Sequence, residues 1–307
     1  MKKMPDVLKD GLVGVGIGIG AIIPGISGAT VALVFGSFKK IVNAVSGLIS
    51  KQFLKNFLIL LPFGIGVLLA VLGLIKPFQL AFEHCMFAIV CLFGALIVGS
   101  FPGLIDNVKG HPVKPLNIVM LVIGFAVAAM IGVISVLTKA NTAIINLFAE
   151  RPFYLYLILL GLGTIAASGM TVPGFSASML LLAVGFYVPI INLFSFEFIK
   201  TEPGAFFGLI GSFVGGVVIG FFLFSYLMSY LLDKHPLNTH YTIIGFVAGS
   251  LVAIFVNSRM FDYFESGVNI LDWILAPIFI VIGVTAAYLF VRLSRKQKAS
   301  EEETENA

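Results

Sequence analysis

Charged residues are scarce in this sequence of 307 residues: Asp, Glu, Lys and Arg make up only 11% of it, against about 25% in soluble domains. Hydrophobic residues make up 59%, and the mean hydropathy is +1.08. This composition excludes a soluble globular domain and predicts an integral membrane protein. The apolar runs are long and rich in glycine, whereas a membrane β-barrel would show short alternating segments, so we expect an all-α polytopic protein.

Residues that support catalysis or metal binding are also few. Cys85 and Cys91 lie in or beside one apolar segment, where small buried side chains are expected rather than a disulfide or metal pair. The four histidines form no HExxH motif and there is no P-loop, so we expect no metal, no cofactor and no direct use of ATP. No basic patch interleaves with aromatic residues, which argues against nucleic-acid binding. Any energetic coupling would use an ion gradient, of H⁺ or Na⁺, and no cleavable signal peptide is expected.

Two apolar segments, Gly11–Gly36 and Gly161–Gly185, are interrupted near the middle by a Pro-Gly pair. Proline removes a backbone donor and glycine permits positive φ, so a helix is expected to break there. The segments are copies, because aligning Pro24 with Pro173 (a shift of 149 residues) aligns several other residues. These pairs are Gly14/Gly163, Gly20/Gly169, Gly25/Gly174, Ser27/Ser176, Gly36/Gly185 and Asn43/Asn192. Matched broken segments in two halves point to the binding site of a transporter.

Six further apolar segments are long enough to span a bilayer, which needs about 20 residues. Lysines flank the first broken segment on both sides, at residues 2–9 and 39–55, and the positive-inside rule puts both flanks in the cytoplasm. A segment with both ends on one side is a re-entrant hairpin. If the second broken segment behaves alike, the basic cluster Arg292–Lys298 is cytoplasmic too, so both termini are predicted there. The six spans are 57–75, 81–100, 117–138, 205–231, 239–256 and 273–293.

Each half is therefore predicted to be one re-entrant helical hairpin plus three transmembrane helices. Because three is odd, the halves have opposite orientation, which makes an inverted-topology repeat in a single membrane domain of residues 1–307. Repeat one covers residues 8–140 and repeat two residues 150–293. The tail, 294–307, is expected to be cytoplasmic and disordered.

The hairpin tips offer polar groups at mid-membrane depth, where broken backbone is tolerated only inside protein or beside a water-filled cavity. Serine and threonine at the start of each second half-helix would leave unpaired N–H groups that favour an anion, phosphate above all. The alternative is that Pro-Gly makes a tight turn with local serine caps. The candidate substrate-binding residues at the tips are Pro24, Gly25, Ser27, Gly28, Thr30, Pro173, Gly174, Ser176 and Ser178.

Ionisable residues near the apolar segments supply further candidates. Arg151 is predicted to pair with a phosphate, because guanidinium matches phosphate oxygens in a fork, unless it pairs with Glu150. Lys76, Lys139 and Arg259 sit at span ends and are expected to be interfacial anchors. Glu83 and His84 open a span, where they could relay a proton, contact a headgroup or cap the helix, and Asn43 and Asn192 could line the pathway or cap a helix.

The stretch Leu8–Thr30, LKDGLVGVGIGIGAIIPGISGAT, together with the second Pro-Gly-x-Ser motif, resembles a bacterial and archaeal membrane family now associated with undecaprenyl-phosphate translocation. The resemblance runs to about Leu293. It implies a non-enzymatic translocase that returns this lipid carrier across the bacterial cytoplasmic membrane for reuse in peptidoglycan synthesis. Ala177 stands where the first copy has Gly28, so the two tips need not be equivalent.

Two other functions remain compatible with the residues alone. A secondary transporter or channel for a small anion could use the same hairpin tips. An intramembrane lipid phosphatase is disfavoured, because the sequence lacks a catalytic constellation. The sequence predicts polyprenyl phosphate as the partner on the strength of the resemblance, and it predicts no oligomeric state.

Overall fold

A computed structural model describes residues 6–23, 28–47, 52–137, 140–168 and 177–305 of the chain. Within these ranges the regular structure is entirely helical, as the composition predicts. Among the described residues, six helical segments are long and apolar enough to cross a membrane, so the chain is a multi-pass membrane protein, and they correspond to the six predicted spans. They are α4 (Phe53–His84), α5 (Met86–Ile105), α6 (Pro115–Leu137), α13 (Pro203–Lys234), α14 (Pro236–Phe255) with α15 (Ser258–Ser266), and α16 (Ile270–Glu305).

The remaining helices are shorter, and four of them form the two parts of each broken segment, α1 and α2 in the first and α8 and α10 in the second. The predicted tips between these parts, at 24–27 and 169–176, lie outside the described residues. Gly36 and Gly185 follow the second half-helices with φ of 65° and 82°, a conformation in which glycine is favoured, and this is why both helices stop there. The shorter helices are α1 (Asp6–Ile22), α2 (Gly28–Val34), α3 (Phe38–Gly47), α7 (Ala140–Glu150), α8 (Phe153–Ala166), α10 (Ala177–Ala183), α11 (Tyr187–Leu193) and α12 (Phe196–Thr201).

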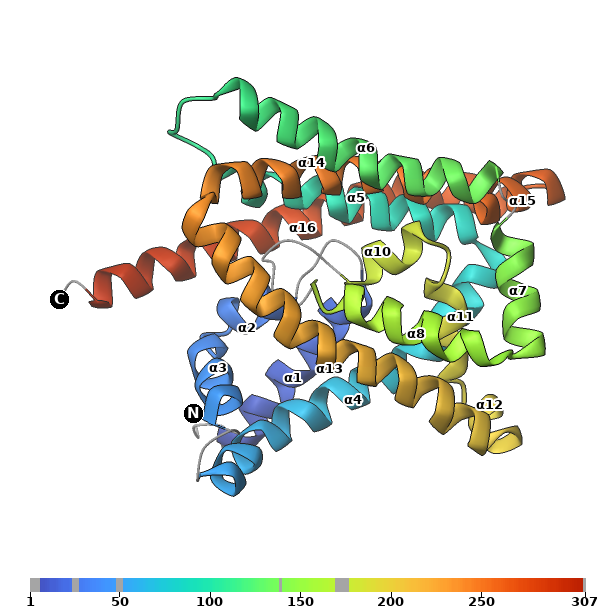
Figure 1. Cartoon of the computed structure of the whole chain (residues 1–307), viewed down its shortest axis with the longest axis horizontal. Coiled ribbons are helices and arrows are strands. Elements are labelled where there is room, and N and C mark those ends of the chain that lie inside the picture. Colours follow the sequence, from blue (N-terminus) through green and yellow to red (C-terminus); the bar gives the residue numbers. More distant parts are fainter. Residues whose placement is uncertain (1–5, 24–27, 48–51, 138–139, 169–176, 306–307) are drawn as a thin grey trace.

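The helices pack in one pattern that occurs twice. Helix α1 packs along α4, and α8 packs along α13 in the same way (Figure 1). Helix α6 packs on α14, and α16 packs on α5, so the last long helix of each half lies against the middle long helix of the other half. The short helices α2 and α10 also match in position. The first and last residues of α10, 177 and 183, lie 149 positions after those of α2, 28 and 34.

Glycines bring the paired helices into backbone contact. Gly66 of α4 lies against the carbonyl group of Gly11 in α1, and Gly216 of α13 lies against the carbonyl group of Leu160 in α8. A Cβ atom at either glycine would overlap that carbonyl group. Lipid removes most of the hydrophobic driving force between helices, so such close packing through small residues is what holds membrane helices together.

An aromatic cluster joins the two halves near the broken segments. Tyr187, at the start of α11, is buried with its ring centroid 5.8 Å from that of Phe82 and 6.1 Å from that of Phe93. Its hydroxyl group donates a hydrogen bond of 2.9 Å to the carbonyl oxygen of Ile22, in the last turn of α1. The terminal carbonyl groups of a helix have no partner inside the helix, so this bond satisfies one of them from the other half of the chain.

The two ends of the molecule carry different elements. Figure 1 shows the N-terminus, α3, the connection between α5 and α6, and the C-terminus at one end, with α7, α12 and α15 at the opposite end. The prediction of a disordered tail from residue 294 is wrong, because α16 continues as a helix to Glu305. Arg295 holds this extension with a forked pair to Asp106, at 2.6 and 2.9 Å, and the tail is rich in Lys, Glu and Ala, which favour helix.

Candidate functional site

The predicted tip residues fall into two groups. Six of them lie outside the described residues: Pro24, Gly25, Ser27, Pro173, Gly174 and Ser176. The other three lie in the short helices that follow the tips. Gly28 begins α2 and faces Ile17 of α1, Thr30 lies one half-turn further along α2, and Ser178 is buried in α10 with 2% of its surface exposed.

The described ends of the two broken segments approach one another. Helix α1, which leads into the first tip, contacts α10, which leads out of the second. The bond from Tyr187 to Ile22 fixes the same neighbourhood, because it joins the end of α1 to the helix that follows α10. With seven residues each, α2 and α10 are too short to carry a strong helix dipole, so an anion site here would depend mainly on polar groups of the tips themselves.

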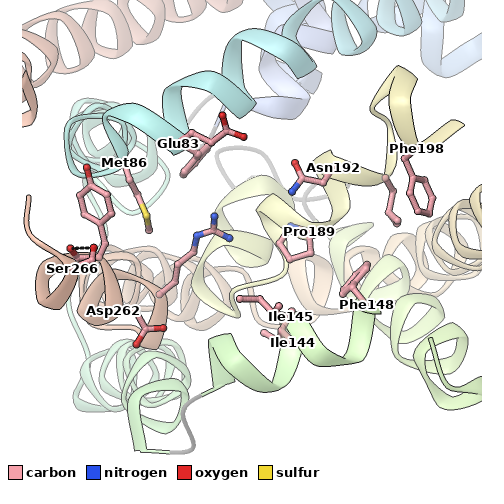
Figure 2. Close-up of a pocket in the computed structure, with 14 residues that line it drawn as sticks. Glu83, Met86, Ile144, Ile145, Phe148, Pro189, Asn192, Phe198, Asp262 and Ser266 are labelled. Atoms are coloured by element: carbon pink, nitrogen blue, oxygen red, sulfur yellow. Dashed lines mark hydrogen bonds between the residues drawn. The ribbon is translucent and has the colours of Figure 1, made fainter. Parts of the chain in front are cut away.

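A cavity of about 590 Å³ opens at the end of the molecule that carries α7, α12 and α15 (Figure 2). It brings together two of the predicted contact residues, Glu83 of α4 and Asn192 of α11, whereas His84, Asn43 and Arg151 are not among its lining. The lining residues are Phe82, Glu83, Met86, Ile144, Ile145, Phe148, Pro189, Asn192, Leu193, Phe198, Arg259, Asp262, Tyr263 and Ser266.

The predicted polar candidates differ in their surroundings. Asn192, on α11, accepts a hydrogen bond of 3.0 Å at its Oδ1 atom from Nε2 of Gln79 on α4. Glu83 and His84 are both exposed at the end of α4, and only Glu83 reaches the cavity. Asn43 is exposed on α3, at the opposite end of the molecule (Figure 1). Asn43 and Asn192 therefore occupy matching sequence positions but lie at opposite ends.

Arg151 is engaged by the protein itself. The chain turns by 119° between α7 and α8, and Arg151 occupies this turn with a φ of 50°. Its guanidinium group forms a forked ion pair with Glu202, with Nη2 at 2.7 Å from Oε1, and its centre lies 5.4 Å from the ring centroid of Phe198. Nε also donates to the carbonyl oxygen of Phe148, at 3.2 Å. Its partner within the protein is thus Glu202, and not the neighbouring Glu150 that the sequence offered as the alternative to a phosphate group.

Arg259 is the residue that the sequence analysis missed. It was expected to be an interfacial anchor, and the structure places it in the wall of the cavity, partly buried at the start of α15. Buried Asn257 fixes this position: its Oδ1 accepts from the backbone N–H of Met260 at 3.0 Å, and its Nδ2 donates to the carbonyl oxygen of Ile254 at 2.8 Å. The only sequence signal was an Asn-Ser pair, a common helix cap, directly before a basic residue.

The lining can bind an anionic group that is attached to an apolar one. Arg259 and the amide group of Asn192 are hydrogen-bond donors, and most of the remaining lining is aliphatic or aromatic. Tyr263 is less available, because its hydroxyl group already donates to Oδ2 of Asp272 at 2.5 Å. Among the described residues, no three His, Cys, Asp or Glu side chains gather closely enough to hold a metal ion.

Comparison with known proteins identifies the family. Residues 17–269 match the model of a family described as undecaprenyl phosphate translocase-like. A polyprenyl-phosphate transporter of Staphylococcus aureus is 30% identical over 96% of this chain and 99% of its own length. Another polyprenyl-phosphate transporter, from Vibrio cholerae, is 25% identical over 82% of this chain and 79% of its own length. No solved structure matches the chain. The chain belongs to the undecaprenyl phosphate translocase-like family.

Proposed function

We propose that this protein carries a polyprenyl phosphate, in bacteria undecaprenyl phosphate, from the outer to the inner leaflet of the cytoplasmic membrane. There the lipid carrier would be reused for peptidoglycan and other envelope polymers. The protein acts as a translocase without a chemical step, and both of its termini face the cytoplasm. The names of its relatives, polyprenyl-phosphate transporter, support the passenger.

The observation that carries the mechanism is the packing pattern that occurs twice. A broken segment and one long helix form a pair in each half, α1 with α4 and α8 with α13, and each half exchanges its last long helix with the other. We propose that this duplication is an inverted-topology repeat, in which both broken segments are re-entrant hairpins that enter the membrane from opposite faces. Such repeats give a site near the midplane that can be reached from either side in turn.

The phosphate headgroup would be held between the two hairpin tips. The headgroup cannot cross hydrocarbon unaided, because desolvating a charge without partners is far too costly. The isoprenoid tail has no such barrier and can stay in the surrounding lipid. Many large apolar side chains on the long helices are exposed, for example Leu68, Val122 and Phe222, as expected of a surface that faces lipid.

A reconstituted transport assay tests this proposal. The purified protein is placed in vesicles that contain undecaprenyl phosphate in both leaflets, and a membrane-impermeant phosphatase is added outside. Without translocation only the outer-leaflet lipid is hydrolysed, and with translocation the inner pool becomes accessible as well. Protein-free vesicles are the control. An inner pool that stays protected would contradict the proposal, and vesicles that instead release trapped inorganic phosphate would favour a small-anion transporter or channel.

A further inference from the structure

We propose that the cavity between α4, α7, α11 and α15 binds a prenyl phosphate headgroup, with Arg259 and Asn192 as its phosphate ligands. This inference rests on the proposed function and deepens it, because it adds a second binding site, away from the hairpin tips, with its own residues. The cavity lies at the end of the molecule opposite to the two termini (Figure 1). If the termini are cytoplasmic, this is the face on which the lipid must be taken up.

Arg259 combines partial burial with the lack of an ion-pair partner among the described residues. Other described cations for which this part of the chain provides no partner, such as Lys76, Lys200 and Arg292, are exposed, and three are paired. Arg151 is paired with Glu202, Arg295 with Asp106 and Lys40 with Asp10. For Arg259, the described part of the chain provides no ion pair within 4.0 Å and no hydrogen bond, although the side chain is partly buried. A partly buried cation without a direct ion-pair partner is costly, so an anion that enters the cavity would gain from pairing with it.

The geometry of Asn192 complements this cation. Gln79 donates to the Oδ1 atom of Asn192, which orients the side-chain amide and leaves its two N–H donors for another acceptor. Figure 2 shows the amide nitrogen of Asn192 turned toward the middle of the lining. A phosphate oxygen accepts hydrogen bonds, so it would bind to the N–H groups of Asn192. The Oδ1 atom of Asn192, which accepts from Gln79, is not needed for this. The site therefore presents donors to the cavity at the position where an anion needs them.

Two carboxylates also line the cavity, and their placement limits their effect. In Figure 2 the carboxylate of Asp262 is directed away from Glu83 and Asn192. Glu83 is exposed in the last turn of α4, so water screens its charge. Both residues would still repel a second negative group, which favours a monophosphate headgroup over a diphosphate one.

The apolar part of the lining identifies the ligand as an amphipathic phosphate. Ile144, Ile145 and Phe148 of α7 line the cavity together with Pro189 and Leu193 of α11. A hydrated inorganic phosphate would leave these walls without a partner, whereas the first isoprene units of a prenyl phosphate would contact them. The volume of about 590 Å³ is typical of small-molecule sites and is far too small for a long polyprenyl chain, so the rest of the tail would remain in lipid.

Binding of farnesyl phosphate to the purified full-length protein, measured by calorimetry, tests the inference. A charge-assisted hydrogen bond contributes enough that Arg259→Gln should weaken binding about ten- to hundred-fold. Arg259→Lys should fall between this variant and the wild type, because it keeps the charge but loses the fork. The matched control is Arg295→Gln, which removes an arginine outside the cavity and should bind like the wild type. Farnesol, which lacks the phosphate, should bind far more weakly than farnesyl phosphate.

A second measurement does not depend on the stability of the Arg259 variants. Ile145→Cys is introduced with Cys85→Ser and Cys91→Ser, and farnesyl phosphate should slow the alkylation of the new thiol. Wild-type affinity of Arg259→Gln, or alkylation at an unchanged rate, overturns the inference while the vesicle assay can still show translocation. Equal protection by inorganic phosphate overturns the ligand class. Failure of the wild type both to bind farnesyl phosphate and to translocate lipid overturns the proposed function as well.

Discussion

The carboxylate of Asp272 accepts a hydrogen bond of 2.8 Å from the backbone N–H of Ala88, although 184 residues separate the two. Ala88 is in the first turn of α5, where N–H groups have no partner within the helix, so Asp272 of α16 caps a helix of the other half. The other oxygen of the carboxylate accepts from the hydroxyl group of Tyr263 on α15. Asp272 has none of its surface exposed and thus links three helices.

We expect Asp272→Ala to lower the free energy of unfolding by about 2–4 kcal/mol, because it leaves a buried N–H and a hydroxyl group without their acceptor. Asp272→Asn should cost less, since its side-chain oxygen can still accept from Ala88. Thermal unfolding in detergent measures both changes. Asp233→Ala is the control, because Asp233 is an exposed carboxylate at the end of α13. Equal midpoints for Asp272→Ala and the wild type would show that this cap contributes nothing.

Two adjacent glycines of α13 should respond in opposite ways to the same substitution. A Cβ atom at Gly216 would overlap the carbonyl group of Leu160, whereas a Cβ atom at Gly215 would meet nothing within 4 Å. Gly216→Ala must push α8 and α13 apart, which we expect to cost about 1–3 kcal/mol. Gly215→Ala should be neutral or stabilising by up to about 1 kcal/mol, because alanine favours helix more than glycine does.

The same pair of substitutions can be made in the other half, where it tests the duplication. Gly66 contacts the carbonyl group of Gly11, and Gly64 has open space around its Cα. Gly66→Ala should therefore behave like Gly216→Ala, and Gly64→Ala like Gly215→Ala, in thermal unfolding and in size-exclusion profiles. Loss of stability in only one half would mean that the two close contacts are not equivalent.

The side chain of Arg151 forms a stabilising ion pair, whereas its backbone has a positive φ that is unfavourable for a residue other than glycine. Its N–H donates to the carbonyl oxygen of Leu147 at 2.9 Å, which closes α7 with a left-handed residue, a place usually taken by glycine. Arg151→Gly relieves the strain of a positive φ, about 1 kcal/mol, while Arg151→Ala keeps it. Both lose the pair with Glu202, which is partly exposed and contributes at most about 1 kcal/mol. We therefore expect Arg151→Gly to unfold at a higher temperature than Arg151→Ala, and the reverse order would contradict the strain.

The spans could be predicted because their signals are local. Apolar length marks the long helices, and the glycine-ended motifs recur at a fixed shift of 149 residues, which is also the displacement between α2 and α10. Membrane-spanning length depends only on consecutive residues. A repeat can likewise be recognised from the sequence alone, without knowledge of tertiary contacts.

The cavity and the ion pairs could not be predicted, because each depends on residues far apart in the chain. Arg151 reaches across 51 residues to Glu202, whereas the sequence suggested a phosphate group as its partner, with the neighbouring Glu150 as the alternative. The turn of 119° after α7 sets the direction of Arg151, and the sequence shows only the proline that follows it. Arg259 shares its position at a span end with ordinary anchors, and only the packing of α15 against α7 distinguishes it.

The hairpin tips carry the prediction that bears most directly on mechanism. Ser27→Leu combined with Ser176→Leu should abolish translocation in the vesicle assay while expression and thermal stability stay close to those of the wild type. Leucine removes a polar group from each tip and fills the space that a phosphate group would need, and burying the phosphate without partners is prohibitive. Ser225→Leu, in the apolar part of α13, is the control for a serine-to-leucine change in the membrane. If the double variant translocates lipid at the wild-type rate, the headgroup does not pass between the tips.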